Sequence, residues 1–454
     1  MLVRFIVDNL YSFGKRTEFN TLPGKPRTLS EHVYTLECGV KVLKLSALYG
    51  ANAAGKSNLV NAIALLEGLV LGNIDGDFVA AKKFKLERHE GSDEQLLAVE
   101  FVQDGDCFLY AIKVVGGRIA VEELYQSGKS KDILIYERTT DEKLVSDIHF
   151  SPEFEEHEKN RMLKDIILTE FVEPNKPIIQ LLANRENEQL AMVRNVFTWF
   201  KLGLNVLAPE PNPAIFEQRF ETDKGFMSFV QDVVKTYHVG ISNISVEKTP
   251  LEDAFGKTAE GREFTDKLRN SIMQDSARAL QLMNKETSER FLLVREGDDI
   301  WVKQLQLEHR TYGDKGVQFD LSSESDGTVK LLNLLPAIYD VIHNRHVYVI
   351  DELERSIHPS LIKELVRKFS HDDKSLGQLI FTTHESVLLD QSIFRQDEIW
   401  FAEKDNGGCT ELYSLSQYRE HKTIDIRKGY LEGRYGAIPF LGNLKDLNWH
   451  DNRE

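Results

Sequence analysis

One short stretch near the amino terminus constrains the fold more than any other. Residues 50–57 read GANAAGKS and have the form GxxxxGKS, in which a glycine-rich turn surrounds a polyphosphate with backbone N–H groups. Residues 42–49 before it are apolar and strand-like, and residues 58–66 after it carry apolar side chains at helical spacing. The sequence therefore predicts a strand, a phosphate-binding turn and a helix whose amino end faces a polyphosphate.

Five residues of this loop are assigned to the nucleotide and its metal. Gly50, Asn52 and Gly55 are assigned to ATP binding, Lys56 to the β- and γ-phosphates, and Ser57 to Mg²⁺ as well as ATP. A chance glycine turn would not be expected to have this strand and this helix on its two sides. We therefore expect ATP and Mg²⁺ as cofactors.

Composition restricts the class of protein. The chain has 454 residues, which is enough for two or three domains, and a net charge of −16. That charge argues against a general nucleic-acid coat but leaves a local basic groove open. Cys38, Cys107 and Cys409 form no CxxC pair, which gives no metal framework and suits a reducing compartment. Without a signal-peptide pattern or a membrane-length apolar run, we expect a soluble cytoplasmic protein.

The pattern of apolar residues predicts three parts. Residues 1–150 form an amino-terminal lobe with the phosphate loop and, from about residue 84 to 136, hairpins of an antiparallel sheet. Residues 151–285 read mainly as helices, and residues 286–454 return to alternating strands and helices, where Pro336 should kink one helix or begin a second. The predicted fold class is α/β: a mixed sheet with a P-loop core and an antiparallel β subdomain, split by a mainly helical insertion.

A second strand ends in two acids. Residues 347–352 read VYVIDE, so that Asp351 and Glu352 follow a buried strand. Two acids can simply end a strand, but beside a phosphate loop Asp351 is expected to bind Mg²⁺, directly or through water, and Glu352 to act as general base. Asp351 lies far along the chain from Lys56, which indicates that a domain is inserted between two halves of one ATPase.

Two further motifs fit that interpretation. Residues 321–330 read LSSESDGTVK and resemble the ABC signature LSGGQ in a variant form, with Ser325 and Gly327 as the best candidates for contact with a γ-phosphate. An ordinary helix cap at Ser325 is compatible with the same contact. His384 ends a later apolar strand, and its position after the other motifs resembles that of a switch histidine, which contacts the γ-phosphate and orients water.

The motifs in this order resemble the ABC-type AAA ATPases of the SMC, RecF and OLD kind, and among them the ATPases of prokaryotic anti-phage defence systems. The resemblance covers nearly the whole chain. It is carried by residues 9–14, 50–57, 324–328, 351–359 and 428–439. It implies that residues 353–359 form a D-loop.

The resemblance also implies partners. In ABC-type ATPases the signature of one subunit meets the nucleotide held by the P-loop of another, so the implied assembly is a homo-oligomer, at least a dimer, with composite ATP sites. The implied role is a sensor or scaffold subunit that hydrolyses ATP and controls a separate TOPRIM-like nuclease or toxin in abortive infection, with a phage protein as trigger. No membrane partner is expected.

Two other functions stay open at this point. One is a DNA-repair ATPase of the RecF or SMC type that clamps DNA, and the other is an enzyme with its own nuclease activity. The acidic net charge counts against both. Only about 70 residues follow His384, and they contain no DxD, so we expect no TOPRIM domain of the kind that OLD nucleases carry after the ATPase.

Overall fold

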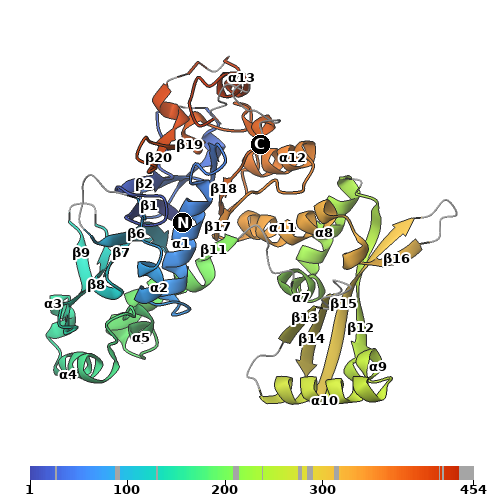
Figure 1. Ribbon diagram of the computed structural model, residues 1–454, viewed down its shortest axis with the longest axis horizontal. Helices are drawn as coiled ribbons and strands as arrows, with labels where there is room; N and C mark the ends of the chain where they lie inside the picture. Colours follow the sequence, from blue (N-terminus) through green and yellow to red (C-terminus); the bar gives the residue numbers. More distant parts are fainter. Residues whose placement is uncertain are drawn as a thin grey trace, which may run out of the picture. The chain divides into compact units, whose positions relative to one another are not determined.

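The chain divides into two compact units (Figure 1). The first comprises Met1–Pro209, Val341–Glu354 and Lys363–Glu454, and the second comprises Glu210–Asp340 and Arg355–Ile362. The structure is a computed structural model, and the residues it describes are 1–25, 28–86, 93–128, 131–207, 214–237, 239–274, 279–283, 290–310, 316–418, 420–421 and 424–438. No helix among these residues is both long and apolar enough to span a membrane.

A six-stranded sheet forms the centre of the first unit. Its strands in spatial order are β11 (Leu204–Leu207), β17 (Val347–Ile350), β18 (Gln378–Thr382), β5 (Leu45–Gly50), β19 (Ile399–Lys404) and β20 (Thr410–Ser414). All neighbours are parallel except β19 and β20, which are antiparallel. Every residue of β5, β17 and β18 is buried, as expected for parallel strands covered on both faces. The carboxyl ends of these three strands therefore meet at one edge.

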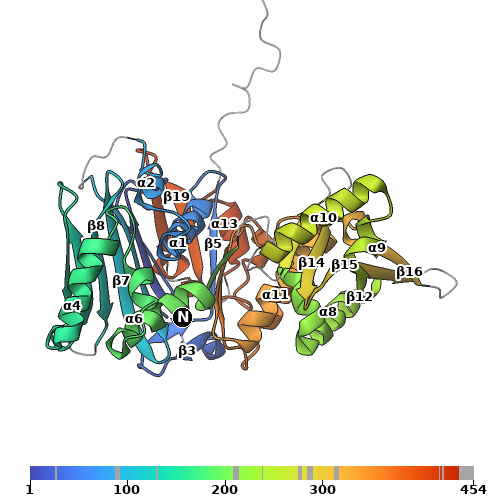
Figure 2. The same cartoon turned by 90° about the horizontal axis from the view of Figure 1, so that it is seen from below.

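A seven-stranded antiparallel sheet forms the second layer of this unit. Its strands in spatial order are β10 (Ser146–Phe150), β9 (Ile133–Thr140), β8 (Arg118–Gln126), β7 (Asp106–Val115), β6 (Gln95–Gln103), β1 (Leu2–Asp8) and β2 (Thr17–Asn20). Helix α1 (Lys56–Val70) lies between the two sheets (Figure 2). Nine of its residues are buried, because it packs against apolar side chains of both layers. These two sheets confirm the predicted mixed sheet with an antiparallel β subdomain.

Short elements complete the first unit. Its further strands are β3 (Val33–Thr35) and β4 (Lys41–Leu43), which pair with each other. Its further helices are α2 (Gly76–Ala80), α3 (Pro152–Glu155), α4 (Glu158–Ile166), α5 (Ile179–Ala183), α6 (Ala191–Thr198), most of α12 (Pro359–Ser370) and α13 (Ile426–Leu431).

The expected boundary at residue 150 differs from the one observed. Residues 151–209 belong to the first unit, because Trp199 and Phe200 are fully buried in its core and Trp199 stacks on Phe101 with 3.9 Å between ring centres. Strand β11 also pairs with β17 of the central sheet. The interrupting segment therefore starts near residue 210 and ends at 340, instead of spanning 151–285.

The second unit combines helices with a five-stranded sheet. The strands β12 (Ile241–Pro250), β15 (Asp299–Arg310), β14 (Arg290–Glu296) and β13 (Ala279–Met283) are antiparallel neighbours, and β16 (Gly316–Asp320) pairs with β15. The helices are α7 (Ala214–Thr222), α8 (Lys224–Thr236), α9 (Leu251–Phe255), α10 (Ala259–Gln274) and most of α11 (Asp326–His343). A small apolar core of its own holds this sheet to α9 and α10.

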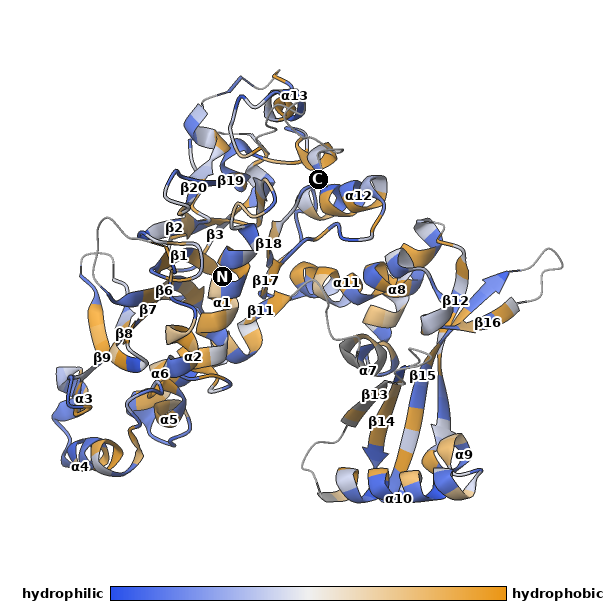
Figure 3. Cartoon of the chain, viewed as in Figure 1, coloured by the Kyte–Doolittle hydropathy of each residue, from blue (hydrophilic) through white to orange (hydrophobic). Residues whose placement is uncertain are grey.

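Helices predominate between residues 151 and 285, as predicted, but β11, β12 and β13 were not foreseen there. Hydrophilic and hydrophobic residues are intermixed in this unit (Figure 3), and buried residues do not alternate regularly with exposed ones along β12, so its period-two pattern is weak. Helix α11 continues through Pro336 as a single helix. The proline therefore does not begin a second helix, and Leu335 and Ala337 on either side of it are buried.

We predict that Trp199→Ala lowers the free energy of unfolding by about 3–5 kcal/mol, because it leaves a large cavity in a core that also supports the central sheet. Met192→Ala on α6 is the matched control, since Met192 is 41% exposed. Urea unfolding followed by circular dichroism measures both. Equal effects of the two substitutions would show that residues 151–209 are not part of the core.

Candidate nucleotide site

The phosphate loop begins where β5 ends. At two of its positions, only glycine avoids a collision between a side chain and neighbouring atoms. Gly55 has a φ of 107°, and a Cβ atom added there would lie 2.1 Å from Thr410 Oγ1. A Cβ atom on Gly50 would lie 2.6 Å from the carbonyl oxygen of Ala402. Helix α1 starts directly afterwards at Lys56. The strand, turn and helix predicted from GxxxxGKS are therefore present, and its backbone can approach a phosphate closely.

Hydroxyl groups from remote parts of the chain hold this loop. Thr410 Oγ1 lies 2.9 Å from the carbonyl oxygen of Ala54 and 2.7 Å from Ser12 Oγ. Asn58 on α1 donates to the same Ser12 Oγ at 2.7 Å. The turn at residues 9–14 and the start of β20 thus support the loop. The sequence motif at 9–14 did not reveal this role, because its partners lie far away in the chain.

Asp351 connects the loop to the end of β17. Its Oδ1 accepts hydrogen bonds from Ser57 Oγ at 3.1 Å and from Thr382 Oγ1 at 2.5 Å. A hydroxyl and a carboxylate oxygen in this arrangement are the hard ligands that Mg²⁺ takes, with phosphate and water as its remaining ligands. Ser57 and Asp351 therefore fit the predicted metal site, and Thr382 is a positioning residue that the sequence interpretation missed.

Glu352 has an unusual backbone conformation. Its φ is 51°, in the left-handed region that non-glycine residues rarely adopt. Its backbone N–H donates to Thr382 Oγ1 at 2.8 Å, so one hydroxyl holds both members of the acid pair. The side chain is half-buried. A strained residue held this firmly at a strand end is typical of a functional site.

Lys56 folds back onto the loop. Its Nζ donates to the carbonyl oxygens of Gly50 at 2.9 Å and Ala51 at 3.1 Å, and lies 3.4 Å from His384 Nδ1. Burial lowers the pKa of Lys56 to about 8, although the negative charge of Asp351 opposes that shift. Burial, followed by the charge of Lys56, lowers the pKa of His384. A neutral His384 therefore faces a cationic Lys56 near neutral pH.

Glu354 is a further acid at this site that the sequence interpretation did not assign. Its Oε1 accepts a hydrogen bond from the backbone N–H of His384 at 2.6 Å. Its Oε2 is buried and has no hydrogen-bond partner among the described residues. Its negative charge raises the pKa values of both Lys56 and His384, against the effect of burial. The sequence feature that could have identified Glu354 is its place in the D-loop-like stretch, two residues after Glu352.

Three predicted residues remain to be located: Ser325, Gly327 and Asn52. Ser325 and Gly327 belong to the second unit, whereas the P-loop belongs to the first. Ser325 is exposed, and its Oγ accepts from the backbone N–H of Thr328 at 3.2 Å, which is the helix cap considered from sequence. A Cβ atom on Gly327 would lie 2.6 Å from the carbonyl oxygen of Ser356. Asn52 is exposed on the loop.

A Q-loop glutamine could not be assigned from the sequence. Gln95 is buried and donates to the carbonyl oxygen of Val79 at 2.9 Å, so its amide is already engaged within the first unit. Of the carboxyl-terminal motif at residues 428–439, Pro439 lies outside the described residues. The preceding part packs on the central sheet, where the ring of Tyr430 stacks on that of Phe401 with 5.7 Å between ring centres.

Residues 207–390 match a family model described as "AAA domain, putative AbiEii toxin, Type IV TA system". The match covers less than half of the chain and includes both acids of the β17 end, His384 and the signature-like stretch. It supports an AAA-type ATPase domain. No curated protein matches the sequence.

Three solved structures of SMC heads share a low level of similarity with this fold. An SMC head bound to the C-winged helix domain of ScpA has a TM-score of 0.43 and 11% identity, over 92% of this chain and 99% of that one. The head domain from Thermotoga maritima has a TM-score of 0.35 and 12% identity, over 91% and 98%. A Pyrococcus furiosus head with an extended coiled coil, bound to the C-terminal domain of ScpA, has a TM-score of 0.38 and 13% identity, over 95% and 99%.

We predict that ATP binding is accompanied by proton uptake at alkaline pH. With a pKa of about 8, Lys56 is mostly neutral at pH 8.5, and a bound triphosphate favours its ammonium form, so most of one proton should be taken up. At pH 7 the ammonium is already present and uptake should be small. Affinity should therefore fall as the pH rises through about 8.

Calorimetric titration of ATP in two buffers with different ionisation heats measures this uptake. Identical binding heats in both buffers at pH 8.5 would contradict the assignment of Lys56 to the phosphates. The titration at pH 7 is the internal control.

Proposed function

We propose that this chain is a Mg²⁺-dependent ATPase that releases ADP and phosphate. The observation that carries the proposal is the hydrogen bond between Ser57 and Asp351, because it joins the phosphate loop and the acidic strand end in one site although 294 positions separate them. The AAA-domain match supports the same activity.

Each residue of the site has a proposed role. Backbone N–H groups of the loop and the Lys56 ammonium would balance the phosphate charge, and Ser57 and Asp351 would hold Mg²⁺. When bound, Mg²⁺ would neutralise charge that develops on the phosphates. Glu352 accepts the proton of the attacking water as general base, and neutral His384 hydrogen-bonds that water or the γ-phosphate. Thr382 keeps the two acids in place through its two hydrogen bonds.

We also propose that the nucleotide site is shared between subunits. Ser325 is exposed at the amino end of α11, where a hydroxyl and a helix terminus favour an anion. Gly327 has no side chain to obstruct that end of the helix, and a Cβ atom there would collide with the carbonyl oxygen of Ser356. In a homo-oligomer, at least a dimer, this end of one subunit would meet the triphosphate held by Lys56 of another.

The biological role that we propose is a cytoplasmic sensor or scaffold in anti-phage defence. The chain would control a separate TOPRIM-like nuclease or toxin, and a phage protein would be the trigger. The matching family model is described as a putative AbiEii toxin of a type IV TA system, and this supports a role in defence. Chain length and motif order also resemble AriA, the ATPase of the PARIS anti-phage system. A DNA-clamping ATPase of the RecF or SMC type is the alternative, and salt-sensitive DNA binding would favour it.

We predict that Glu352→Gln still binds ATP but loses hydrolysis by about 10²–10⁴-fold, because an amide cannot accept the water proton. Glu364→Gln on α12 is the control, since Glu364 is exposed. Phosphate release and nucleotide binding are measured on both purified variants. Turnover by Glu352→Gln at the parent rate would remove Glu352 from the mechanism.

The purified chain by itself should cut neither DNA nor RNA, because the proposed toxic activity belongs to another protein. Gel assays with Mg²⁺ or Mn²⁺ measure this. Cleavage that persists through purification and disappears when acids of this chain are replaced would contradict the proposal of a separate effector.

The shared site predicts complementation between two inactive variants. Lys56→Ala should lose ATP binding, whereas Ser325→Arg should bind ATP but prevent closure because a bulky side chain replaces a hydroxyl. A mixed dimer has one site with both lesions and one with neither, so ATPase activity should partly return. Ser228→Arg on α8 is the control for Ser325→Arg, since Ser228 is also exposed.

The two variants are co-expressed with different tags, and hydrolysis by the mixed species is compared with each parent. Full activity of Ser325→Arg alone would refute the signature assignment. Activity of the mixed species no greater than that of either parent would contradict independent composite sites.

A further inference from the structure

Two of the three cysteines lie side by side although the sequence separates them by 69 positions. Cys38 stands in the turn between β3 and β4, and Cys107 is the second residue of β7. Their Sγ atoms are 2.8 Å apart, closer than the ~3.5 Å at which carbon atoms pack best. Both side chains are half-buried, so a small reagent in solvent can reach them.

We propose that Cys38 and Cys107 are a redox-active pair that closes an intrachain disulfide when the protein meets a peroxide. The inference rests on this geometry and is independent of the nucleotide site, so its failure would leave the ATPase proposal intact. Reversible disulfides of this kind are typical of redox sensing in reducing compartments.

The chemistry balances with hydrogen peroxide as the oxidant. The thiolate of Cys38 attacks one peroxide oxygen, the O–O bond breaks, and a sulfenic acid and hydroxide form. Cys107 then attacks the sulfenic sulfur, its thiol proton leaves with the hydroxyl group as water, and the S–S bond forms. In sum, two thiols lose two electrons, and one peroxide becomes two waters. Burial raises the pKa of the Cys107 thiol, so the first step is assigned to Cys38.

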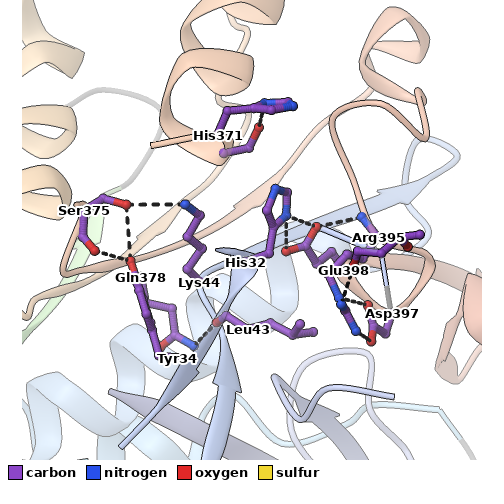
Figure 4. A network of polar contacts seen from close by, with 12 residues as sticks. His32, Tyr34, Leu43, Lys44, His371, Ser375, Gln378, Arg395, Asp397 and Glu398 are labelled. Atoms are coloured by element: carbon purple, nitrogen blue, oxygen red, sulfur yellow. Dashed lines mark hydrogen bonds and ion pairs between the residues drawn. The ribbon is translucent and has the colours of Figure 1, made fainter. Parts of the chain in front are cut away.

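A bond here would fix the segment that leads into the phosphate loop. Residues 32–44 are already anchored on one side by a buried polar network (Figure 4). Lys44 Nζ donates to the carbonyl oxygen of Asp372 at 2.8 Å, and Tyr34 donates to that of Ser375 at 2.8 Å. The cysteines would add a covalent link from the β3–β4 turn to the antiparallel sheet. The closed loop contains the P-loop and α1.

The first consequence is a higher melting temperature on oxidation, because a cross-link over so long a loop removes conformations from the unfolded chain. We expect a rise of several degrees that dithiothreitol reverses. Cys38→Ser and Cys107→Ser should abolish the rise, whereas Cys409→Ser is the matched control and should keep it.

The test is made on the purified full chain. Hydrogen peroxide is added and removed with catalase, the protein is denatured, and free thiols are alkylated before peptide mass spectrometry. The expected result is that Cys409 alone remains alkylated, and that a peptide pair joined through Cys38 and Cys107 separates on reduction. Cys107→Ser should instead carry a sulfenic acid on Cys38 that dimedone labels.

Two results would overturn the proposal. One is equal alkylation of all three cysteines after peroxide treatment. The other is cross-linking that involves Cys409 as often as the proposed pair. A Cys38–Cys107 bond that forms without a change in melting temperature would contradict the stabilising consequence.

Discussion

The pairing of three parallel strands, β17, β18 and β5, is the constraint on which the rest of this structure depends. Each strand is short and fully buried, and each ends at the same edge of the sheet. This arrangement alone brings Asp351, Thr382 and the phosphate loop together. The long segment between Lys56 and Asp351 can contain a second unit because the sheet, and not chain continuity, assembles the site.

The electrostatics of the site follow from its burial. Lys56 is buried beside the carbonyl oxygens of its own loop, which cannot supply a full negative charge. A triphosphate can supply that charge, so the site prefers an anion beside the Lys56 ammonium. The negative charges of Asp351 and Glu354 partly offset the effect of burial on the pKa of Lys56. Burial keeps the pKa of His384 low, so its ring is neutral near neutral pH and suits the proposed role of hydrogen-bonding water or the γ-phosphate.

The local parts of this site could be predicted from sequence, because a motif such as GxxxxGKS states the conformation and the chemistry together. Lys56, Ser57, Asp351 and Glu352 were singled out in this way. The structure brings Ser57 and Asp351 into one hydrogen bond, while the roles assigned to the four residues stay predictions. Thr382, Ser12 and Thr410 could not be found, because their hydroxyls act on partners remote in sequence, as with the 398 positions between Thr410 and Ser12.

The fold shows the same limit. Helical periodicity predicted α6 correctly but did not show which core it joins, so residues 151–209 were assigned to the insertion. Trp199 decides that question through its contact with Phe101, a long-range contact that has no local pattern. Strand β12 was missed because most of its side chains are at least partly exposed, which removes the apolar alternation that marks a strand.

The affinity for ATP with and without Mg²⁺ tests the proposed nucleotide site most directly. If Ser57 and Asp351 hold the metal, Mg²⁺ strengthens ATP binding to the parent chain, and Asp351→Asn removes this gain while Mg²⁺-free binding persists. Asp373→Asn, an exposed acid of the same unit, should behave as the parent. An affinity that does not depend on Mg²⁺, or a gain that survives in Asp351→Asn, would contradict the proposed metal site.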